Sequence, residues 1–265
     1  MLFAAANLSF LFTDLPFLQR FSAARAAGFS AVEYLFPYDY PVADIRQELS
    51  DNALKQVLFN VSPGDWEAGD RGLACLPDRS DEFRDTIAQA QAYARGLNCP
   101  RLHCMAGLCP DLSDARYYQT YLDNLAFAAE SLAADGIELM IEAINREDMP
   151  GYFLADIDEA AKVVQTLREA GHVNVSLQFD FYHCARIHGE ATERVAQYAG
   201  LIGHFQIAGR HGRHEPDGAS GEYKQALNEA AMRAPGRFVG FEYKPAGDAV
   251  RGLDWMRSYA ASLSF

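Results

Sequence analysis

Short apolar runs alternate with longer amphipathic segments along the whole chain. Runs rich in Val, Ile, Leu and Phe predict buried strands, and apolar positions at helical spacing, such as Phe17, Phe21 and Ala24, predict helices. Eight strands are predicted, at Phe3–Ser9, Ala31–Phe36, Gln56–Val61, Arg101–Gly107, Glu138–Asn145, Asn174–Tyr182, Gly203–Ala208 and Arg237–Tyr243. Eight helices are predicted, at Pro16–Gly28, Val42–Asn52, Glu82–Asn98, Asp114–Asp135, Asp156–Gly171, Glu190–Leu201, Glu222–Ala234 and Ala249–Leu263.

The ends of the helical segments support this division of the chain. Gly28 and Gly171 directly follow helical runs, where glycine is favoured, and Asp14 and Asp156 precede them. Strand and helix alternate eight times with no linker-like stretch, so residues 1–265 are predicted to form a single α/β domain, a (β/α)₈ TIM barrel. A doubly wound open sheet is the alternative, but it would need a glycine-rich phosphate-binding turn after an early strand, and the sequence has none.

Composition and charge narrow the range of partners. The chain has 265 residues, of which 49% are hydrophobic, as in ordinary globular proteins. It contains 23 Lys and Arg against 36 Asp and Glu, a net charge of −13. A chain this acidic is repelled by a nucleic-acid backbone and by an anionic membrane surface, so we expect neither as a partner.

The cysteines and the N-terminus indicate a cytoplasmic protein. Five cysteines form no paired CxxC units, which argues against both a disulfide scaffold and a zinc ribbon. The apolar N-terminus, residues 1–12, has no basic residue before it and is interrupted by Asn7 and Ser9, so it is predicted to be a strand rather than a signal peptide. No run approaches the roughly 20 apolar residues of a membrane span. The sequence leaves open whether the chain forms a homo-oligomer.

Four oxygen-bearing side chains occupy equivalent places in the last four predicted strands: Glu142, Asp180, Gln206 and Glu242. Each is flanked by apolar residues, so alternation along the strand points it into the barrel while its neighbours pack outward. A single such residue is most often hydrogen-bonded or solvated, but three buried carboxylates together need a cation. An all-oxygen set suits Mg²⁺ or Mn²⁺, so we predict a site for one of these ions.

Other polar residues near the predicted strand ends suggest contacts with a small anion. His183 follows Asp180 by three residues and is predicted to contact substrate rather than to be a mere loop histidine. The loop after the seventh strand carries Arg213, His214 and Glu215 within a basic cluster, and an arginine can bind a carboxylate with two hydrogen bonds. The alternative for this loop is scattered surface charge. His103 is left open, His204 is expected in the core, and the long loop 62–79 is predicted to lie over the site.

Several segments resemble the hydroxypyruvate isomerase family of xylose isomerase-like TIM barrels: Ala6–Ser9, Phe36–Tyr40, Pro63–Trp66, Gln206–Ala208, His214–Pro216 and Glu242–Pro245. The resemblance runs over the whole chain. It implies a divalent-metal isomerase of small hydroxy-oxo acids, with Glu142, Asp180, Gln206 and Glu242 as metal ligands and Glu142 and Glu242 as the acid/base pair acting through an enediolate. Segments 97–99, 103–107, 206–209 and 213–217 look closer to the 2-oxo-tetronate isomerase branch. The chain departs from the family at Ser220–Tyr223.

Three other functions remain as alternatives. An endonuclease barrel of the same superfamily would need a histidine-rich multi-zinc cluster and a basic face. A non-catalytic barrel that binds sugar acids would not need the paired glutamates. A keto-sugar 3-epimerase would normally have histidine where Gln206 stands.

Overall fold

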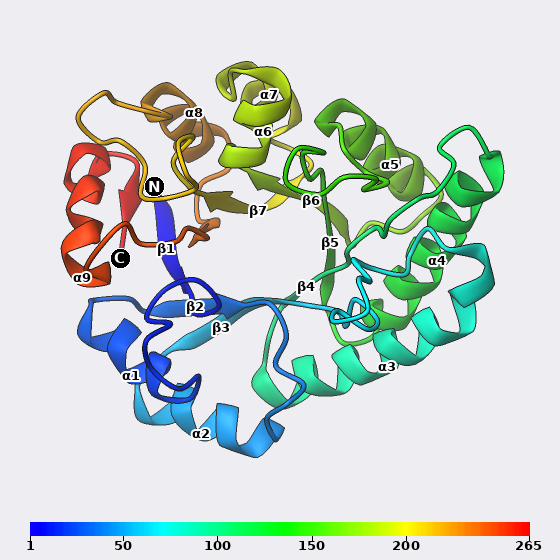
Figure 1. Cartoon of the computed structure of the whole chain (residues 1–265), viewed down its shortest axis with the longest axis horizontal. Coiled ribbons are helices and arrows are strands. Elements are labelled where there is room, and N and C mark those ends of the chain that lie inside the picture. Colours follow the sequence, from blue (N-terminus) through cyan, green and yellow to red (C-terminus); the bar gives the residue numbers. More distant parts are fainter.

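The strands form one closed parallel barrel in the computed structural model, which describes all 265 residues (Figure 1). Hydrogen bonds connect the strands in chain order from β2 to β8, and β1 pairs with both β8 and β2, so the ring has no open edge. The barrel strands are β1 (Leu2–Asn7), β2 (Ala31–Tyr34), β3 (Lys55–Asn60), β4 (Arg101–His103), β5 (Glu138–Glu142), β6 (Val175–Asp180), β7 (Ile202–Ile207) and β8 (Phe238–Phe241). The predicted TIM barrel is confirmed.

The helices lie around the outside of the barrel (Figure 1). They are α1 (Gln19–Ala26), α2 (Val42–Asp51), α3 (Ser80–Leu97), α4 (Ala115–Ala133), α5 (Ile157–Glu169), α6 (Phe181–His188), α7 (Thr192–Tyr198), α8 (Lys224–Arg233) and α9 (Ala249–Gly252). A 3₁₀ turn at Pro77–Arg79 precedes α3, and a longer one, Leu253–Tyr259, follows α9. None of these helices is long and apolar enough to cross a membrane.

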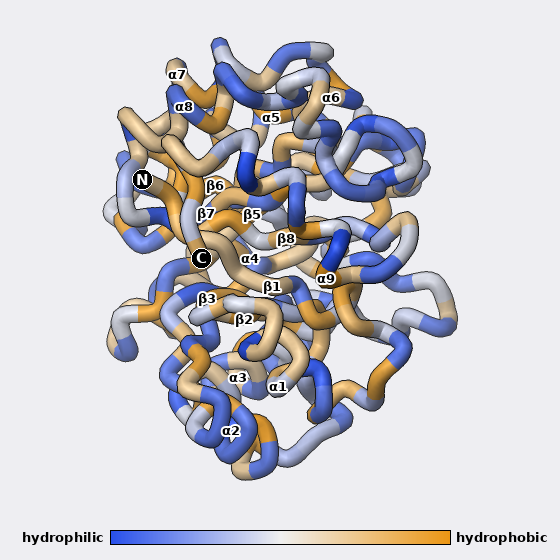
Figure 2. Tube along the Cα trace, turned by 90° about the vertical axis from the view of Figure 1, so that its left-hand side faces the viewer, coloured by the Kyte–Doolittle hydropathy of each residue, from blue (hydrophilic) through white to orange (hydrophobic).

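The main core lies between the strands and the surrounding helices. The aromatic side chains of Phe179, Phe205 and Phe241, which flank the predicted site residues, are all buried there. Phe179 and Phe205 come from neighbouring strands, and their ring centroids are 6.1 Å apart. In Figure 2 the hydrophobic colour is concentrated along the strands, whereas the helices alternate between hydrophobic and hydrophilic residues. This arrangement agrees with the prediction that these aromatic side chains pack outward from the barrel.

Several predicted strands, such as Arg101–Gly107, are shorter in the structure, and two other predicted elements differ more. The sixth strand was predicted to reach Tyr182, but it ends at Asp180 and α6 begins at the next residue. Asp180 stops the strand because its carboxylate accepts a hydrogen bond from the backbone N–H of Tyr182, as a helix N-cap does. The last predicted helix is also interrupted: the chain ends in a short strand, β9 (Leu263–Ser264), which pairs with β1 and brings the two termini close together (Figure 1).

Candidate active site

The strand register places the four predicted metal ligands at one height in the barrel. Glu142 pairs with Gln178, while Asp180 pairs with Gln206, and Gln206 pairs with Gly240. Because the strands of such a barrel tilt by about 36°, the residue at a given height lies about one position beyond the paired residue on each following strand. Applied strand by strand from Glu142, this offset gives positions within one residue of Asp180, Gln206 and Glu242.

A cavity of about 310 Å³ opens at this end of the barrel. It is lined by Glu142 and Glu242 from the strand ends, by His183 from the first turn of α6 and by Arg213 from the loop after β7. The C-terminal ends of the strands carry the active site in TIM-barrel enzymes, so this cavity is the candidate active site. Trp66 and Arg71, from the long loop between β3 and α3, also line it, so that loop lies over the site as expected.

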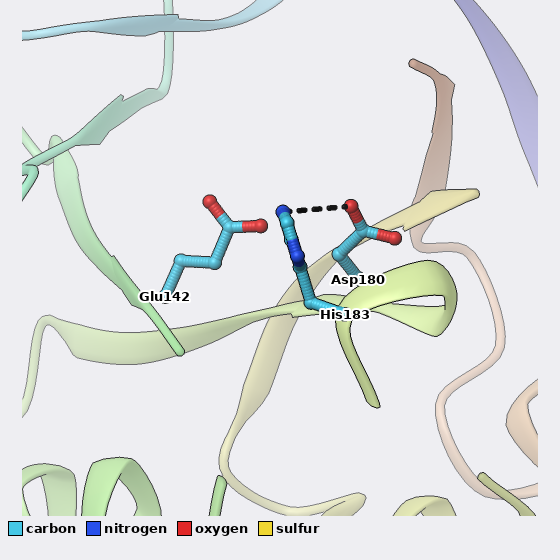
Figure 3. A group of neighbouring side chains, drawn as sticks. All are labelled: Glu142, Asp180 and His183. Atoms are coloured by element: carbon cyan, nitrogen blue, oxygen red, sulfur yellow. Dashed lines mark ion pairs between the residues drawn. The ribbon is translucent and has the colours of Figure 1, made fainter. Parts of the chain in front are cut away.

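Glu142, Asp180 and His183 form a compact cluster at the cavity (Figure 3). One ligand atom from each residue lies within 4.8 Å of the others, and the imidazole lies between the two carboxylates. Glu142 Oε1 and Asp180 Oδ2 are buried and make no hydrogen bond. Buried oxygens without partners are rare in folded proteins, so these two atoms fit a group that the protein binds there, and a divalent cation has the right chemistry.

Gln206 and Glu242, the other two predicted ligands, are hydrogen-bonded to each other and to neighbouring side chains. The Gln206 Nε2 group donates to Glu242 Oε2 at 2.6 Å and to Glu33 Oε1 at 2.8 Å, while its Oε1 accepts a hydrogen bond from Gln178. Gln206 therefore lies beside the carboxylates as predicted, with its oxygen bonded to Gln178. A ligand role for Gln206 requires this oxygen to exchange Gln178 for the metal ion, and that role stays a prediction.

Burial and mutual repulsion raise the pKa of all three carboxyl groups. Burial, followed by repulsion from Glu242 and Asp180, raises the pKa of Glu142 well above its ordinary range. Burial raises the pKa of Asp180 to about 6 and that of Glu242 to about 8, although Arg213 opposes both shifts. A site that favours protons this strongly also favours a cation that takes their place.

The hydrogen bonds of His183 fix the role of each ring nitrogen. Asn145 Oδ1 accepts hydrogen bonds from the backbone N–H groups of Glu147 and Asp148, so the other end of the Asn145 amide is its NH₂ group. That NH₂ group lies 2.7 Å from His183 Nδ1, and the backbone N–H of Asn145 also faces Nδ1. Nδ1 is therefore an acceptor, and in the neutral ring Nε2 carries the proton.

His183 is thus arranged to donate a hydrogen bond, not to bind a metal. Burial, followed by the positive charge of Arg213, lowers the pKa of His183 well below its ordinary value, so the ring stays neutral. Its Nε2–H group lies 3.7 Å from Asp180 Oδ2 and lines the cavity. This geometry supports the predicted contact between His183 and a substrate oxygen.

Arg213 faces the carboxylates of the site. Its Nη2 lies 2.6 Å from Glu242 Oε1 and 3.8 Å from Asp180 Oδ2, and its guanidinium lies over the rings of Phe10 and Tyr182. Residue 213 has a φ of +54°, a left-handed conformation that is uncommon for residues other than glycine. Arg213 is therefore part of the site, but its partners in the structure are acidic side chains.

The structure places His214 and Glu215 away from the cavity. His214 Nδ1 lies 2.8 Å from the backbone oxygen of Lys244, and its side chain is exposed. The Glu215 carboxylate accepts a hydrogen bond from the backbone N–H of Ala246. Both residues connect the loop after β7 to the loop after β8. Neither of them lines the cavity, although both were predicted to bind substrate.

His204 is buried as expected, but sequence reasoning missed its partner Glu33 on the other side of the barrel. Glu33, at the end of β2, is fully buried and accepts hydrogen bonds from Asn7 and Gln206, while His204 Nε2 lies 2.6 Å from its second oxygen. Asn7 also donates to Glu242. The signal was present, because Glu33 stands between Val32 and Tyr34 in the same apolar setting as the four predicted ligands.

His103, which the sequence left open, lines the cavity. Its Nε2 lies 3.6 Å from Glu142 Oε2, and neither ring nitrogen makes a hydrogen bond. Burial, followed by the charge of His204, lowers the pKa of His103 to about 3, so it is neutral at physiological pH. A neutral imidazole beside Glu142 can serve as a polar contact for substrate.

The chain matches the family model of xylose isomerase-like TIM barrels over residues 21–259. It is 45% identical to the 2-oxo-tetronate isomerase of Cupriavidus necator, over 96% of this chain and 97% of that protein. It is 40% identical to the hydroxypyruvate isomerase of Escherichia coli, over 98% of this chain and all of the other (100%). A Brucella melitensis structure described as an AP endonuclease of family 2 superposes with a TM-score of 0.92 at 40% identity, covering 98% of this chain and 99% of that one.

Proposed function

Since the chain belongs to the xylose isomerase-like TIM-barrel family, we propose that it is a divalent-metal-dependent isomerase of small hydroxy-oxo acids. Its predicted resemblance to the hydroxypyruvate isomerases is confirmed by the relatives, which match almost end to end. The relatives at 45% and 42% identity are both 2-oxo-tetronate isomerases, which favours 2-oxo-tetronate over hydroxypyruvate as the substrate.

One observation carries the proposal: two buried glutamates, Glu142 and Glu242, line the same cavity beside Asp180. A hydroxy-oxo acid isomerises when a proton leaves the carbon that bears the hydroxyl group and another returns to the neighbouring carbonyl carbon. The intermediate is an enediolate. For hydroxypyruvate the product is 2-hydroxy-3-oxopropanoate, with the same atoms and no net oxidation. Two carboxyl groups on one cavity can take and return these protons.

A divalent cation, held by Glu142, Asp180, Glu242 and Gln206, would stabilise negative charge on the substrate oxygens. The oxygen-rich ligand set favours Mg²⁺ or Mn²⁺. Within this arrangement one glutamate removes the proton and the other returns it, and His183 donates its Nε2–H to a substrate oxygen. The apolar and aromatic residues of the cavity, among them Phe36 and Trp66, limit the access of water to the reacting carbons.

The direct test is a product assay by NMR with hydroxypyruvate and 2-oxo-tetronate side by side. The metal-loaded protein should convert at least one of them, 2-oxo-tetronate more efficiently, and removal of the metal with a chelator should abolish turnover reversibly. Metal-loaded protein that converts neither acid would contradict the proposal.

The alternatives are less well supported by the same residues. The Brucella structure is described as an endonuclease, but a net charge of −13 and a cavity of about 310 Å³ suit a small molecule better than a DNA duplex. Structures of 3-keto-D-glucoside and keto-sugar epimerases share only 13–18% identity with this chain, a likeness of fold alone. A barrel that only binds sugar acids would not need two glutamates on its ligand cavity.

A further inference from the structure

Two arginines line the cavity, and their surroundings differ. Arg213 lies between Phe10 and Tyr182 and is hydrogen-bonded to Glu242. Arg71, from the loop between β3 and α3, forms no ion pair. The nearest acidic residue in sequence, Asp70, has its carboxylate bonded to Arg79 at 2.7 Å. Arg71 is therefore the arginine of the cavity that forms no ion pair with a protein carboxylate.

The charges of the three carboxylates predicted as metal ligands are balanced without Arg71. Glu142, Asp180 and Glu242 carry three negative charges when ionised, and a divalent cation together with Arg213 supplies three positive ones. Asp148, which is exposed, adds a further negative charge at the edge of the cavity. A substrate that brings its own carboxylate therefore needs another cation, because an unpaired charge in a largely buried site is costly.

The free edge of the Arg71 guanidinium has the shape that a carboxylate requires. Nη1 is used within the loop, where it donates to the backbone oxygens of Trp66 and Asp70. Nε and Nη2 make no hydrogen bond, and together they form an edge that can donate two parallel hydrogen bonds. The guanidinium lies 3.8 Å from the centre of the Trp66 ring, which restricts its orientation.

The loop itself is built to hold Arg71 in place. Gly72 has a φ of +111° and approaches the backbone of Met105 so closely that a Cβ would overlap it. Its backbone N–H donates to the oxygen of Pro63, and the backbone N–H of Asp65 donates to the Asp70 carboxylate. Trp66 packs against Phe36, with ring centroids 5.4 Å apart. A loop bonded at both ends in this way presents a fixed side chain at low cost in entropy.

From this arrangement we propose that Arg71 binds the substrate carboxylate through its Nε and Nη2 groups, and that the loop 62–79 is the acid-recognition element of the site. Arg213 then balances the charge of the metal ligands and contacts substrate oxygens other than the carboxylate. This inference rests on the proposed function, because it assigns one end of the substrate of that reaction. It implies that Arg71 selects acids over neutral hydroxy-carbonyl compounds of the same size.

Four variants of the metal-loaded protein separate these roles. Arg71→Gln removes the charge, and Arg71→Lys keeps the charge but not the paired donors. Arg213→Gln tests the other arginine. Arg84→Gln is the matched control, because Arg84 also lies over an aromatic ring, that of Phe127, but outside the cavity. Two readouts are measured: the affinity for glycerate by calorimetry, and the ratio of kcat/KM for hydroxypyruvate to that for dihydroxyacetone, its neutral analogue.

Arg71→Gln should weaken glycerate binding by about 10- to 100-fold and lower the acid-to-neutral ratio by a similar factor. For Arg71→Lys, the glycerate affinity and the acid-to-neutral ratio should both lie between those of Arg71→Gln and the wild type. Both values for Arg84→Gln should match the wild type. An Arg71→Gln variant that keeps wild-type affinity and ratio would overturn the proposal. So would an equal or larger loss of the ratio in Arg213→Gln, or a wild type that does not bind glycerate.

The same measurements distinguish this inference from the proposed function. If the wild type converts neither acid but its glycerate binding depends on Arg71, the isomerase proposal fails and the carboxylate site stands. If it converts the acids with a ratio that Arg71→Gln does not change, the isomerase proposal stands and the carboxylate site fails.

Discussion

His204 Nε2 lies 2.6 Å from Glu33 Oε2, and both side chains are fully buried. The two residues come from β7 and β2, which lie apart in the ring of strands. The other oxygen of Glu33 accepts hydrogen bonds from Asn7 and Gln206, and both of these residues also donate to Glu242. Glu33 is therefore a positioning residue, which holds the groups around a proposed metal ligand.

The first prediction concerns the loss of this side chain. Glu33→Ala leaves His204, Asn7 and Gln206 buried without their common acceptor, so it should lower the free energy of unfolding by about 3–5 kcal/mol. Urea denaturation measures the change. Glu130→Ala, on the exposed surface of α4, is the control and should stay within about 0.5 kcal/mol of the wild type. A Glu33→Ala variant as stable as the control would mean that Glu33 does not organise the site.

The second prediction concerns Gly240, the neighbour of Gln206 in the strand register. A Cβ at residue 240 would overlap the Glu33 carboxylate, so glycine is needed there for space. Gly240→Ala should displace Glu33 and destabilise the protein by about 1–3 kcal/mol or more. Gly247→Ala is the matched control, because no atom lies within 4 Å of the Cβ it adds. Thermal unfolding of both variants, compared with the wild type, shows whether the space beside Gly240 matters.

The third prediction is a pH dependence. Burial raises the pKa of Glu242 from its ordinary 4.5 to about 8 and that of Asp180 from 3.8 to about 6. Because the folded protein holds these protons more tightly than the unfolded chain, this contribution to stability is fully present at low pH and is lost as the pH rises toward 8. The metal-free protein should therefore lose thermal stability between about pH 5 and pH 8.

A bound cation has to displace the same protons, so metal affinity should change in the opposite direction. It should rise by about tenfold or more between about pH 6 and pH 8, with protons released on binding. Calorimetry in two buffers with different heats of ionisation measures that release. An affinity that does not change with pH would show that Glu242 and Asp180 do not bind the ion.

How far the sequence predicted the site depended on the local pattern around each residue. Glu142, Asp180, Gln206 and Glu242 stand between apolar neighbours, the first three in strands and Glu242 directly after β8, and alternation with barrel tilt is enough to bring them to one height. Glu33 carries the same signal on β2, but the predicted ligand set came only from the last four strands. His183 was expected at a strand end, although the Asp180 side chain ends the strand and starts α6.

The loops were less predictable, because their geometry depends on contacts between distant segments. The basic cluster after β7 contains Arg213, His214 and Glu215 side by side, yet only Arg213 turns into the cavity. Its left-handed backbone conformation is a property of the folded loop that composition does not reveal. Arg71 reaches the cavity because Gly72 packs against the segment that follows β4, an approach between residues more than 30 positions apart.

The fourth prediction concerns the paired glutamates. Glu242→Gln and Glu142→Gln each keep an oxygen near the metal but cannot transfer a proton. Since proton transfer by a placed side chain contributes roughly 10²–10⁴ in rate, kcat should fall by about that factor in each variant. Calorimetry should show metal binding only partly weakened. A metal-loaded Glu242→Gln enzyme with near-normal kcat would leave this glutamate with a binding role alone.

Turnover of the wild type in ²H₂O, followed by NMR, tests the central claim most directly. If Glu142 and Glu242 move the proton through an enediolate, the protonated carboxyl group exchanges with solvent, and deuterium should appear on carbon 2 of the product formed from hydroxypyruvate. The label should depend on added metal. Product that forms at a normal rate with no deuterium at carbon 2 would show direct transfer of hydrogen between the carbons, and would contradict the acid/base roles of the two glutamates.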